Sequence, residues 1–227
     1  MVVFRPFRGW KYNPDVVGDL AKVVSPPYDL ITPELQESLL KRSPYNVVHL
    51  EAGENLDWNA PGGNTYRNTT DLFEEWLRRG VLRREPEPCF YLSQHIFTFQ
   101  GETKSRIGIT GCIGLAEYDS HEVFPHEFTE EPAVLDRVAL MEACNANFSP
   151  IMSLYRDPAK YLNRIFEEVM STTPDIHIRP DEDQELSLWL LSSPEQQTRI
   201  RQFFNDTPVF LADGHHRYEA ALRFQAK

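Results

Sequence analysis

Apolar residues follow two patterns along the chain, and each pattern predicts one kind of element. Short runs rich in β-branched and aromatic residues, bounded by glycine, proline or asparagine, predict buried strands. A turn at residues 100–102 separates two of these runs, which predicts an antiparallel hairpin. The predicted strands cover residues 22–24, 45–52, 90–99, 104–109, 113–118, 151–155, 176–178, 186–191 and 209–211.

Apolar residues at helical spacing predict the helices that alternate with these strands. Thr32 followed by Pro33 is typical of a capped helix start, and Gly80 is typical of a helix end. The helix before Gly80 carries one apolar stripe that we expect in the core: Leu72, Phe73, Trp76 and Leu77. The predicted helices cover residues 32–42, 65–79, 132–146, 158–170, 194–204 and the segment after Asp213.

This order of elements predicts an α/β or α+β fold, in which helices flank a mixed sheet that contains an antiparallel hairpin. We expect a single domain over residues 1–227. The last helical pattern continues to Lys227 without a glycine stop or a following element. We therefore expect the sequence to be the N-terminal part of a longer protein, and the sequence leaves the oligomeric state open.

Composition narrows the classes of partner. The chain has 227 residues, of which 41% are hydrophobic and 25% charged, which is ordinary for a globular protein. Its net charge of −11 argues against nucleic acid or an anionic membrane as a partner. Three dispersed cysteines and the absence of an apolar leader segment lead us to expect a soluble, cytoplasmic protein with reduced thiols.

The densest group of polar residues follows the last predicted strand. Asp213 fits a helix N-cap, Gly214 permits a tight turn, and His215, His216 and Arg217 fall in the first helical turn. Unpaired amides and the positive end of the helix dipole attract anions, so this turn is a candidate phosphate site. An ordinary cap with solvated imidazoles would give the same sequence. We favour the anion site because these five residues are consecutive, directly follow a strand and include no bulky apolar side chain.

Other polar residues are more ambiguous. His126 and Glu127 lie in a loop before a predicted helix, where they could form an acid/base pair, bind metal, or simply be solvated. Arg137 on that helix could contact phosphate or cover the surface, and its neighbour Asp136 is expected to point to a different face. Turn chemistry explains Asp29, after a Pro-Pro loop, as well as catalysis does. None of the common phosphate-loop, dinucleotide, zinc-protease or nucleophile-elbow motifs occurs.

Three stretches together resemble a known family. They are residues 24–31 (Val-Ser-Pro-Pro-Tyr-Asp-Leu-Ile), the run from His126 through Asp136-Arg137 to Tyr155, and residues 212–218 (Ala-Asp-Gly-His-His-Arg-Tyr). In this order they resemble the uncharacterised bacterial and archaeal family called domain of unknown function ten-fifteen. The resemblance implies members longer than this chain. It also implies a lysine where this sequence has Val134, so the anion here would be bound more weakly or through Arg137.

The Asp-Gly-His-His-Arg block is also similar to the phosphate-binding box of the ParB/sulfiredoxin-like superfamily. That group includes CTP-hydrolysing partition proteins, ATP-using sulfiredoxin and free-serine kinases. The family resemblance further implies genes beside those of serine biosynthesis. Both resemblances favour a small-molecule substrate, with free serine as the acceptor they suggest.

Our leading hypothesis is a nucleotide-dependent phosphotransferase or phosphohydrolase that uses ATP or ADP with Mg²⁺. The backbone at Gly214, with His215, His216 and Arg217, would bind phosphates, and Asp213 would bind Mg²⁺ or orient the acceptor hydroxyl. Glu127 or His126 would be the general base and Arg137 a charge clamp. Two alternatives stay open. One is a non-catalytic module that senses a nucleotide or phosphometabolite. The other is a metallohydrolase built from residues 126, 127, 215 and 216.

Overall fold

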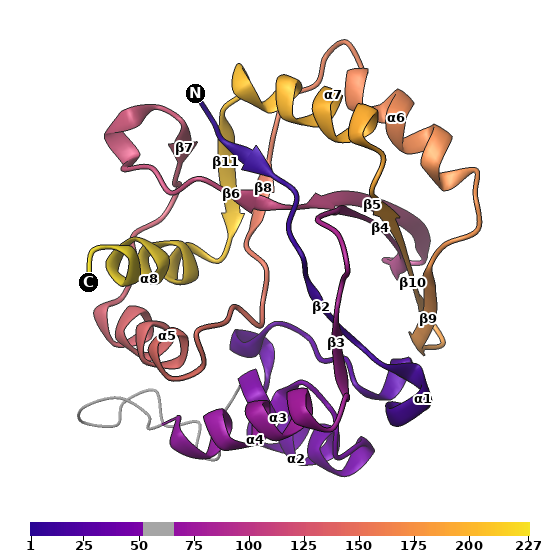
Figure 1. Cartoon of the computed structure of the whole chain (residues 1–227), viewed down its shortest axis with the longest axis vertical. Coiled ribbons are helices and arrows are strands. Elements are labelled where there is room, and N and C mark those ends of the chain that lie inside the picture. Colours follow the sequence, from indigo (N-terminus) through magenta and orange to yellow (C-terminus); the bar gives the residue numbers. More distant parts are fainter. Residues whose placement is uncertain (52–65) are drawn as a thin grey trace.

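The computed structural model describes residues 1–51 and 66–227. In this part of the chain the strands form two small two-stranded sheets, β1-β6 and β2-β3, and two larger ones, β5-β4-β10-β9 and β7-β11-β8 (Figure 1). The strands are β1 (Phe4–Arg5), β2 (Trp10–Tyr12), β3 (Leu82–Arg84), β4 (Phe90–Phe99), β5 (Glu102–Thr110), β6 (Cys112–Ile113), β7 (Val123–Phe124), β8 (Met152–Leu154), β9 (Ile176–Asp181), β10 (Gln184–Leu191) and β11 (Val209–Asp213).

Helices surround these sheets on several sides (Figure 1). Helices α6 and α7 lie together at one end of the molecule, and α2, α3 and α4 gather at the other. The helices are α1 (Pro14–Val17), α2 (Pro33–Arg42), α3 (Val48–Glu51), α4 (Arg67–Arg78), α5 (Glu131–Cys144), α6 (Tyr161–Met170), α7 (Pro194–Asn205) and α8 (His215–Gln225). The mixture of helices with predominantly antiparallel sheets makes this an α+β fold.

The four-stranded sheet contains the predicted hairpin. Strands β4 and β5 pair along their whole length, and β10 pairs with the other edge of β4. Gln100 and Gly101 both have positive φ, 52° and 78°, as a tight two-residue hairpin turn requires. Leu92 and Leu191 from this sheet share the largest core cluster with Phe204 of α7.

The three-stranded sheet positions the last helix. Strand β11 lies in its middle, parallel to β7 and antiparallel to β8. Val209 and Leu211 are buried in the largest core cluster, whereas Phe210 between them is exposed, as the two-residue period of a strand requires. Asp213 therefore sits at the carboxyl end of a central strand, directly before α8.

Helix α8 lies side by side with α5 (Figure 1). Val134 and Val138 of α5 are buried against Ala220 of α8. The small side chain at position 220 lets the two helices approach closely. This contact brings the first turns of α5 and α8, with the loop before α5, into one region of the molecule.

Several predicted helix boundaries are confirmed. Thr32 caps α2 by accepting the amide of Leu35, and Pro33 is the first helical residue. Gly80 follows α4 with a φ of 69°. The predicted apolar stripe on α4 packs into a second core cluster, in which Trp76 is almost fully buried. Thr65, where this helix was expected to begin, lies outside the described residues.

The strands predicted at 22–24 and 45–52 are wrong for the residues that the structure describes, and Ala52 lies outside them. The chain forms a 3₁₀ helix at Leu20–Lys22, with the Asp19 carboxylate accepting the Ala21 amide, and helix α3 in place of the second strand. Asn46 explains both corrections. Its buried side chain accepts the amide of Val48, which starts a helical turn, and donates to the carbonyls of Lys22 and Val24. The side-chain amide of Asn46 thus connects the two segments that were expected to be strands.

Two further predictions need a smaller correction. The strand expected at 113–118 reduces to β6, which leaves the hairpin and pairs with β1. The helix expected from residue 158 begins at Tyr161, because the Asp157 carboxylate accepts the amides of Tyr161 and Leu162. Among the described residues, the helices are all too short or too polar to cross a bilayer.

Candidate functional site

The start of α8 differs from the prediction. Asp213 was expected to be the N-cap, but Gly214 occupies that position, with a φ of 89° and no side-chain cap. The Asp213 carboxylate is instead 2.6 Å from Nη2 of Arg217, so it is not available to the helix amides. The first amides of a helix have no partner within the helix. The amides of His215, His216 and Arg217 therefore remain free to bind a ligand.

Arg217 folds back over this turn. A Cβ at position 214 would lie 3.0 Å from three atoms of its guanidinium, so only glycine allows this close approach. The guanidinium also donates to the Pro150 carbonyl. Its Nε is buried and makes no hydrogen bond, although buried donors are normally paired. Arg217 thus has one donor to spare at the amino end of α8.

Arg137 lies at the centre of a buried ionic cluster. Its Nε donates to Asp136 at 2.9 Å, so these neighbours do form an ion pair, which was not expected for adjacent residues that point to different faces of a helix. Both are only 3% exposed. The Tyr66 hydroxyl joins them, donating to Asp136 at 2.8 Å and accepting from Arg137 at 2.9 Å. The guanidinium also donates to the carbonyl of Glu51, 3.3 Å away. The long arginine side chain reaches the neighbouring carboxylate, and the pair is shielded from water.

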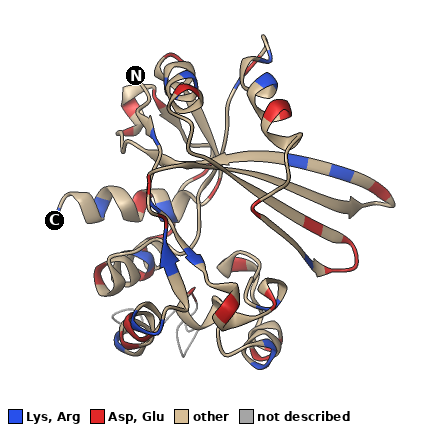
Figure 2. Cartoon of the chain, turned by 45° about the vertical axis from the view of Figure 1, so that its right-hand side comes forward, with Lys and Arg blue, Asp and Glu red and all other residues tan. Residues whose placement is uncertain are grey.

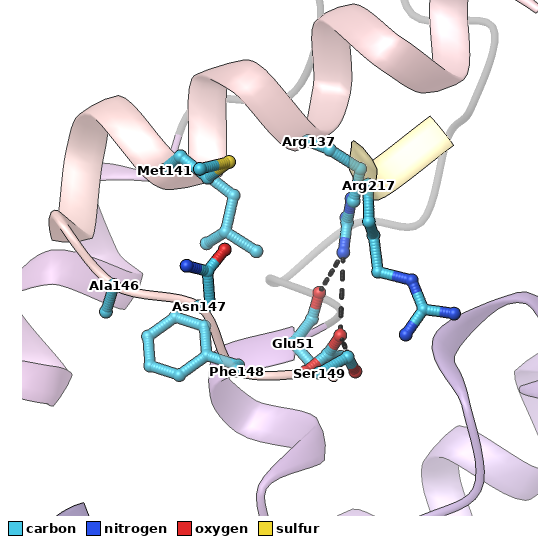
Figure 3. A pocket seen from close by; sticks show the side chains of 9 residues that line it. Glu51, Arg137, Met141, Ala146, Asn147, Phe148, Ser149 and Arg217 are labelled. Atoms are coloured by element: carbon cyan, nitrogen blue, oxygen red, sulfur yellow. Dashed lines mark hydrogen bonds and ion pairs between the residues drawn. The ribbon is translucent and has the colours of Figure 1, made fainter. Parts of the chain in front are cut away.

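The two arginines line one small cavity (Figure 3). Its free volume is about 20 Å³, room for about one water molecule. Glu51 and Ser149 also line it, and Ser149 donates a hydrogen bond to the Glu51 carboxylate. The ring of Tyr28 supports both guanidinium groups, with its centroid 4.2 Å from Cζ of Arg137 and 5.7 Å from Cζ of Arg217. We call this cavity, together with the Tyr28 ring that packs on its two arginines, the arginine cavity.

The arginine cavity joins residues from all three stretches that were singled out in the sequence. Tyr28 follows the Pro-Pro loop, Arg137 and Ser149 belong to the middle run, and Arg217 to the last turn. Burial raises the pKa of the Glu51 carboxyl, while the Ser149 hydrogen bond and the charge of Arg137 oppose that rise. The cavity therefore holds two cations beside a carboxyl group that is costly to ionise.

On the other flank of α8, the loop before α5 meets the helix. His216 Nε2 accepts the amide of Glu130 at 3.0 Å, and His215 Nε2 accepts the amide of His126 at 3.3 Å. An imidazole nitrogen that accepts a hydrogen bond carries no proton, so both Nε2 atoms are unprotonated. The two imidazoles thus hold the loop at residues 126–130 against α8, and they bring His126 and Glu127 to the candidate anion site.

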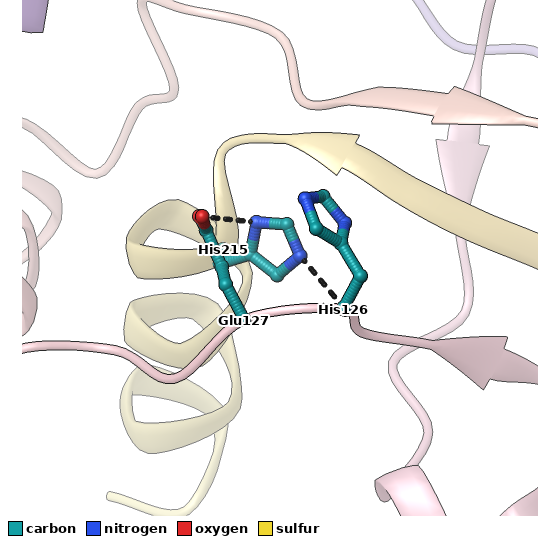
Figure 4. A group of neighbouring side chains, drawn as sticks. All are labelled: His126, Glu127 and His215. Carbon is teal, nitrogen blue, oxygen red and sulfur yellow. Dashed lines mark hydrogen bonds and ion pairs between the residues drawn. The ribbon is translucent and has the colours of Figure 1, made fainter.

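His126 and Glu127 surround the buried ring of His215 (Figure 4). Nδ1 of His126 lies 2.7 Å from the Leu211 carbonyl, which only accepts, so this nitrogen carries the proton and Nε2 keeps its lone pair. A Glu127 carboxylate oxygen lies 2.8 Å from Nδ1 of His215. Burial lowers the pKa of His215, and the negative charge of Glu127 opposes that effect. We call residues 126, 127 and 215 the histidine cluster.

The sequence interpretation missed several of these residues. Glu51 was assigned to a strand, Tyr66 lies in a predicted helix, and Ser149 was given no role. The hydroxyl of Tyr218 was also missed: it donates to the Ala116 carbonyl and accepts the Ala116 amide, which fixes α8 in place. Tyr28, Ser149 and Tyr218 did have a signal, since each lies in one of the three stretches that carried the resemblance.

Val134, where the resemblance implies a lysine, is fully buried between α5 and α8. A lysine amine at this position would have to leave the apolar contact to reach a ligand. In this chain the position therefore contributes packing, and the cations near the turn are Arg137 and Arg217.

Fold and site together define an α+β protein in which a strand–turn–helix unit carries two polar clusters. A family model described as protein of unknown function (DUF1015) matches residues 4–227, so the chain belongs to that family. No curated protein and no solved structure matches the chain.

Proposed function

We propose that the amino end of α8 binds the phosphate of a small molecule, and that the protein is a nucleotide-dependent phosphotransferase or phosphohydrolase. The observation that carries this proposal is the position of Arg217. Its guanidinium lies against Gly214, beside the free amides of His215 and His216, with a buried Nε that has no partner. Free helix amides and a guanidinium are the two donor types that most often bind phosphate together.

The geometry refines the role of each residue. The rings of His215 and His216 accept backbone amides from the loop, so the proposal assigns phosphate contacts to the backbone of α8 and to Arg217. Asp213 has a 41% exposed side chain and remains the candidate for Mg²⁺ or for the acceptor hydroxyl. His126, with an unprotonated Nε2, is the candidate general base, and Glu127 is its neighbour.

Charge distribution supports a small ligand. Acidic and basic residues are interspersed over the helices and the long β4–β5 hairpin (Figure 2). A polyanion gains affinity from many phosphate contacts on one basic face. Two arginines close together match the charge of a single phosphate group better. ATP or ADP with Mg²⁺, and a small acceptor such as serine, remain the ligands we propose.

Calorimetry with ATP or ADP and Mg²⁺, after a thermal-shift panel of nucleotides, tests the proposal. Replacing Arg217 by alanine should weaken binding by about 1.5–3 kcal/mol, the usual contribution of a charged hydrogen bond. Arg223→Ala is the matched control, because Arg223 lies on the same helix but pairs with Glu131. Equal affinities of the folded Arg217→Ala variant and the wild type would contradict the assignment.

A binding module without catalysis is the second candidate, and one observation favours it. Successive helix residues are about 100° apart, so His215 and Arg217 point about 200° apart around α8. The candidate base and the arginine cavity therefore lie on different flanks of the helix. NMR of nucleotide and amino-acid mixtures distinguishes the two, because a binding module forms no new phosphorylated or hydrolysed product over hours.

A further inference from the structure

The histidine cluster brings three ligand atoms together. One atom each from His126, Glu127 and His215 lies within 4.8 Å of the other two. Two of the residues are adjacent in the loop after β7, and the third begins α8. Figure 4 shows the ring of His215 with the Glu127 carboxylate at one side and the His126 ring at the other. Imidazole nitrogen and carboxylate oxygen are common ligands of divalent transition metals.

The contact between His215 and Glu127 is not an ordinary hydrogen bond. His215 is only 1% exposed, and its Nδ1 lies 2.8 Å from a carboxylate oxygen of Glu127. The same nitrogen nevertheless has no hydrogen-bond partner, because the two groups are poorly aligned. Buried polar nitrogens are normally paired. An atom pair that is close but misaligned is expected where both atoms point to a common third position.

His126 is oriented as metal-binding histidines usually are. Its Nδ1–H donates to the Leu211 carbonyl at 2.7 Å, which fixes the tautomer and leaves the Nε2 lone pair free. Such a second hydrogen bond holds the ring of a ligand and raises its basicity. Its ring also meets the ring of His215 edge to face, with centroids 4.5 Å apart. The strand that leads into α8 thus orients the loop ligand.

We propose that His126, Glu127 and His215 bind one divalent transition-metal ion, with zinc as the cation that best suits two imidazoles and one carboxylate. Three protein ligands leave a coordination position open in a tetrahedral site. Glu127 is 52% exposed on its side chain, so this position faces solvent. This proposal does not rest on the proposed nucleotide binding. With the metal in place, His126 and Glu127 are ligands rather than bases.

Metal binding also has a local structural consequence. In the metal-free protein, Nε2 of His215 accepts the backbone amide of His126, so the ring proton is on Nδ1. Ligation of a metal through Nδ1 moves that proton to Nε2. The protonated Nε2 then faces the backbone N–H of His126 and can no longer accept a hydrogen bond from it. The hydrogen bond from His126 therefore breaks. The proton shifts within one ring, and none is released by this step.

The test uses the full chain without a histidine tag, stripped of metal and then equilibrated with Zn²⁺ or Co²⁺. We expect about one equivalent of bound metal by dialysis and elemental analysis, and a Co²⁺ visible spectrum of tetrahedral type. His126→Ala and Glu127→Gln should each weaken binding at least tenfold. These variants keep the buried His215, so the folding of α8 is preserved. His121→Ala, an exposed histidine in the preceding loop, is the matched control and should bind like the wild type.

A second readout is the amide of His126. Its NMR signal should shift on Zn²⁺ addition and its hydrogen exchange should accelerate, whereas the Glu130 amide on His216 should stay protected. Binding far below one equivalent would overturn the proposal. Equal affinity in wild type, His126→Ala and Glu127→Gln would overturn it as well, because the metal would then lie elsewhere. Binding that leaves the His126 amide unchanged would exclude ligation by Nδ1 of His215.

Discussion

The two flanks of the first turn of α8 differ in whether their polar groups already have partners within the protein. In the arginine cavity each guanidinium is already paired, Arg137 with Asp136 and Arg217 with Asp213. In the histidine cluster the ligand atoms come close to one another, yet Nδ1 of His215 makes no hydrogen bond. Paired charges stabilise a fold with the site empty, whereas the buried Nδ1 of His215 lies beside the Glu127 carboxylate without a well-aligned hydrogen bond. The first flank is thus the more structural, and the second is more dependent on a ligand.

The largest expected effect is on stability, and it tests whether the buried ion pair of the arginine cavity stabilises the fold. Arg137→Leu would leave Asp136 buried without its cation and should lower the free energy of unfolding by about 3–5 kcal/mol. Urea denaturation measures the loss. Arg79→Ala is the control, because its pair with Glu75 is exposed and should contribute about 0.5 kcal/mol or less. A loss for Arg137→Leu as small as that of the control would mean that the cluster is not structural.

A smaller effect is expected at the turn that both flanks share. Gly214→Ala places a Cβ against the guanidinium of Arg217 and forces a non-glycine residue to a φ of 89°. The strain should cost about 1–3 kcal/mol of stability. Gly80→Ala separates the two causes, because Gly80 has a φ of 69° with open space around it. Thermal or urea unfolding of both variants gives the difference, and equal losses would show that the contact with Arg217 is unimportant.

The smallest expected effects are opposite in sign for the two flanks. The folded state lowers the pKa of His215, so the unfolded chain binds more protons as the pH falls below about 6.5, and stability is lost on acidification. The folded state raises the pKa of Glu51, so the stability that its neutral form contributes is present at low pH and is lost as the pH rises above its ordinary value of 4.5.

Urea midpoints between pH 4.5 and 7.5 measure both trends. Glu51→Gln should remove the loss at rising pH while keeping the loss on acidification that comes from His215. The Ser149 hydroxyl can still donate to the amide oxygen of the substituted side chain, so the variant should fold. A pH dependence identical to that of the wild type would show that Glu51 does not titrate differently in the folded state.

The sequence predicted elements well where local signals agree with the tertiary structure. Gln100-Gly101 between two apolar runs specifies a hairpin, and Thr32-Pro33 specifies a helix start, because both depend on neighbouring residues alone. The strand predicted at 45–52 failed for a non-local reason. Asn46 makes two hydrogen bonds to a segment more than twenty residues earlier, and no periodicity in the sequence reports such contacts.

The candidate site could also be predicted only in part, because its contacts join segments that are far apart in the sequence. Arg137 and Arg217 were chosen by residue type, but their partners Tyr66 and Pro150 depend on how distant segments pack. Asp213 was predicted to cap α8 because aspartate before a helix usually does so. Arg217 one turn later competes for the same carboxylate, and a charged partner at 2.6 Å prevails over helix amides.

The central position of β11 also bears on how the molecule forms during synthesis. Its neighbours β7 and β8 are made long before residues 209–213, and they have no other partner in their sheet. Until the ribosome has released β11, both strands expose unsatisfied backbone groups of the kind that promote aggregation. Both polar clusters assemble in that same late step, so a nascent chain cannot bind its ligands before nearly all of this sequence has been translated.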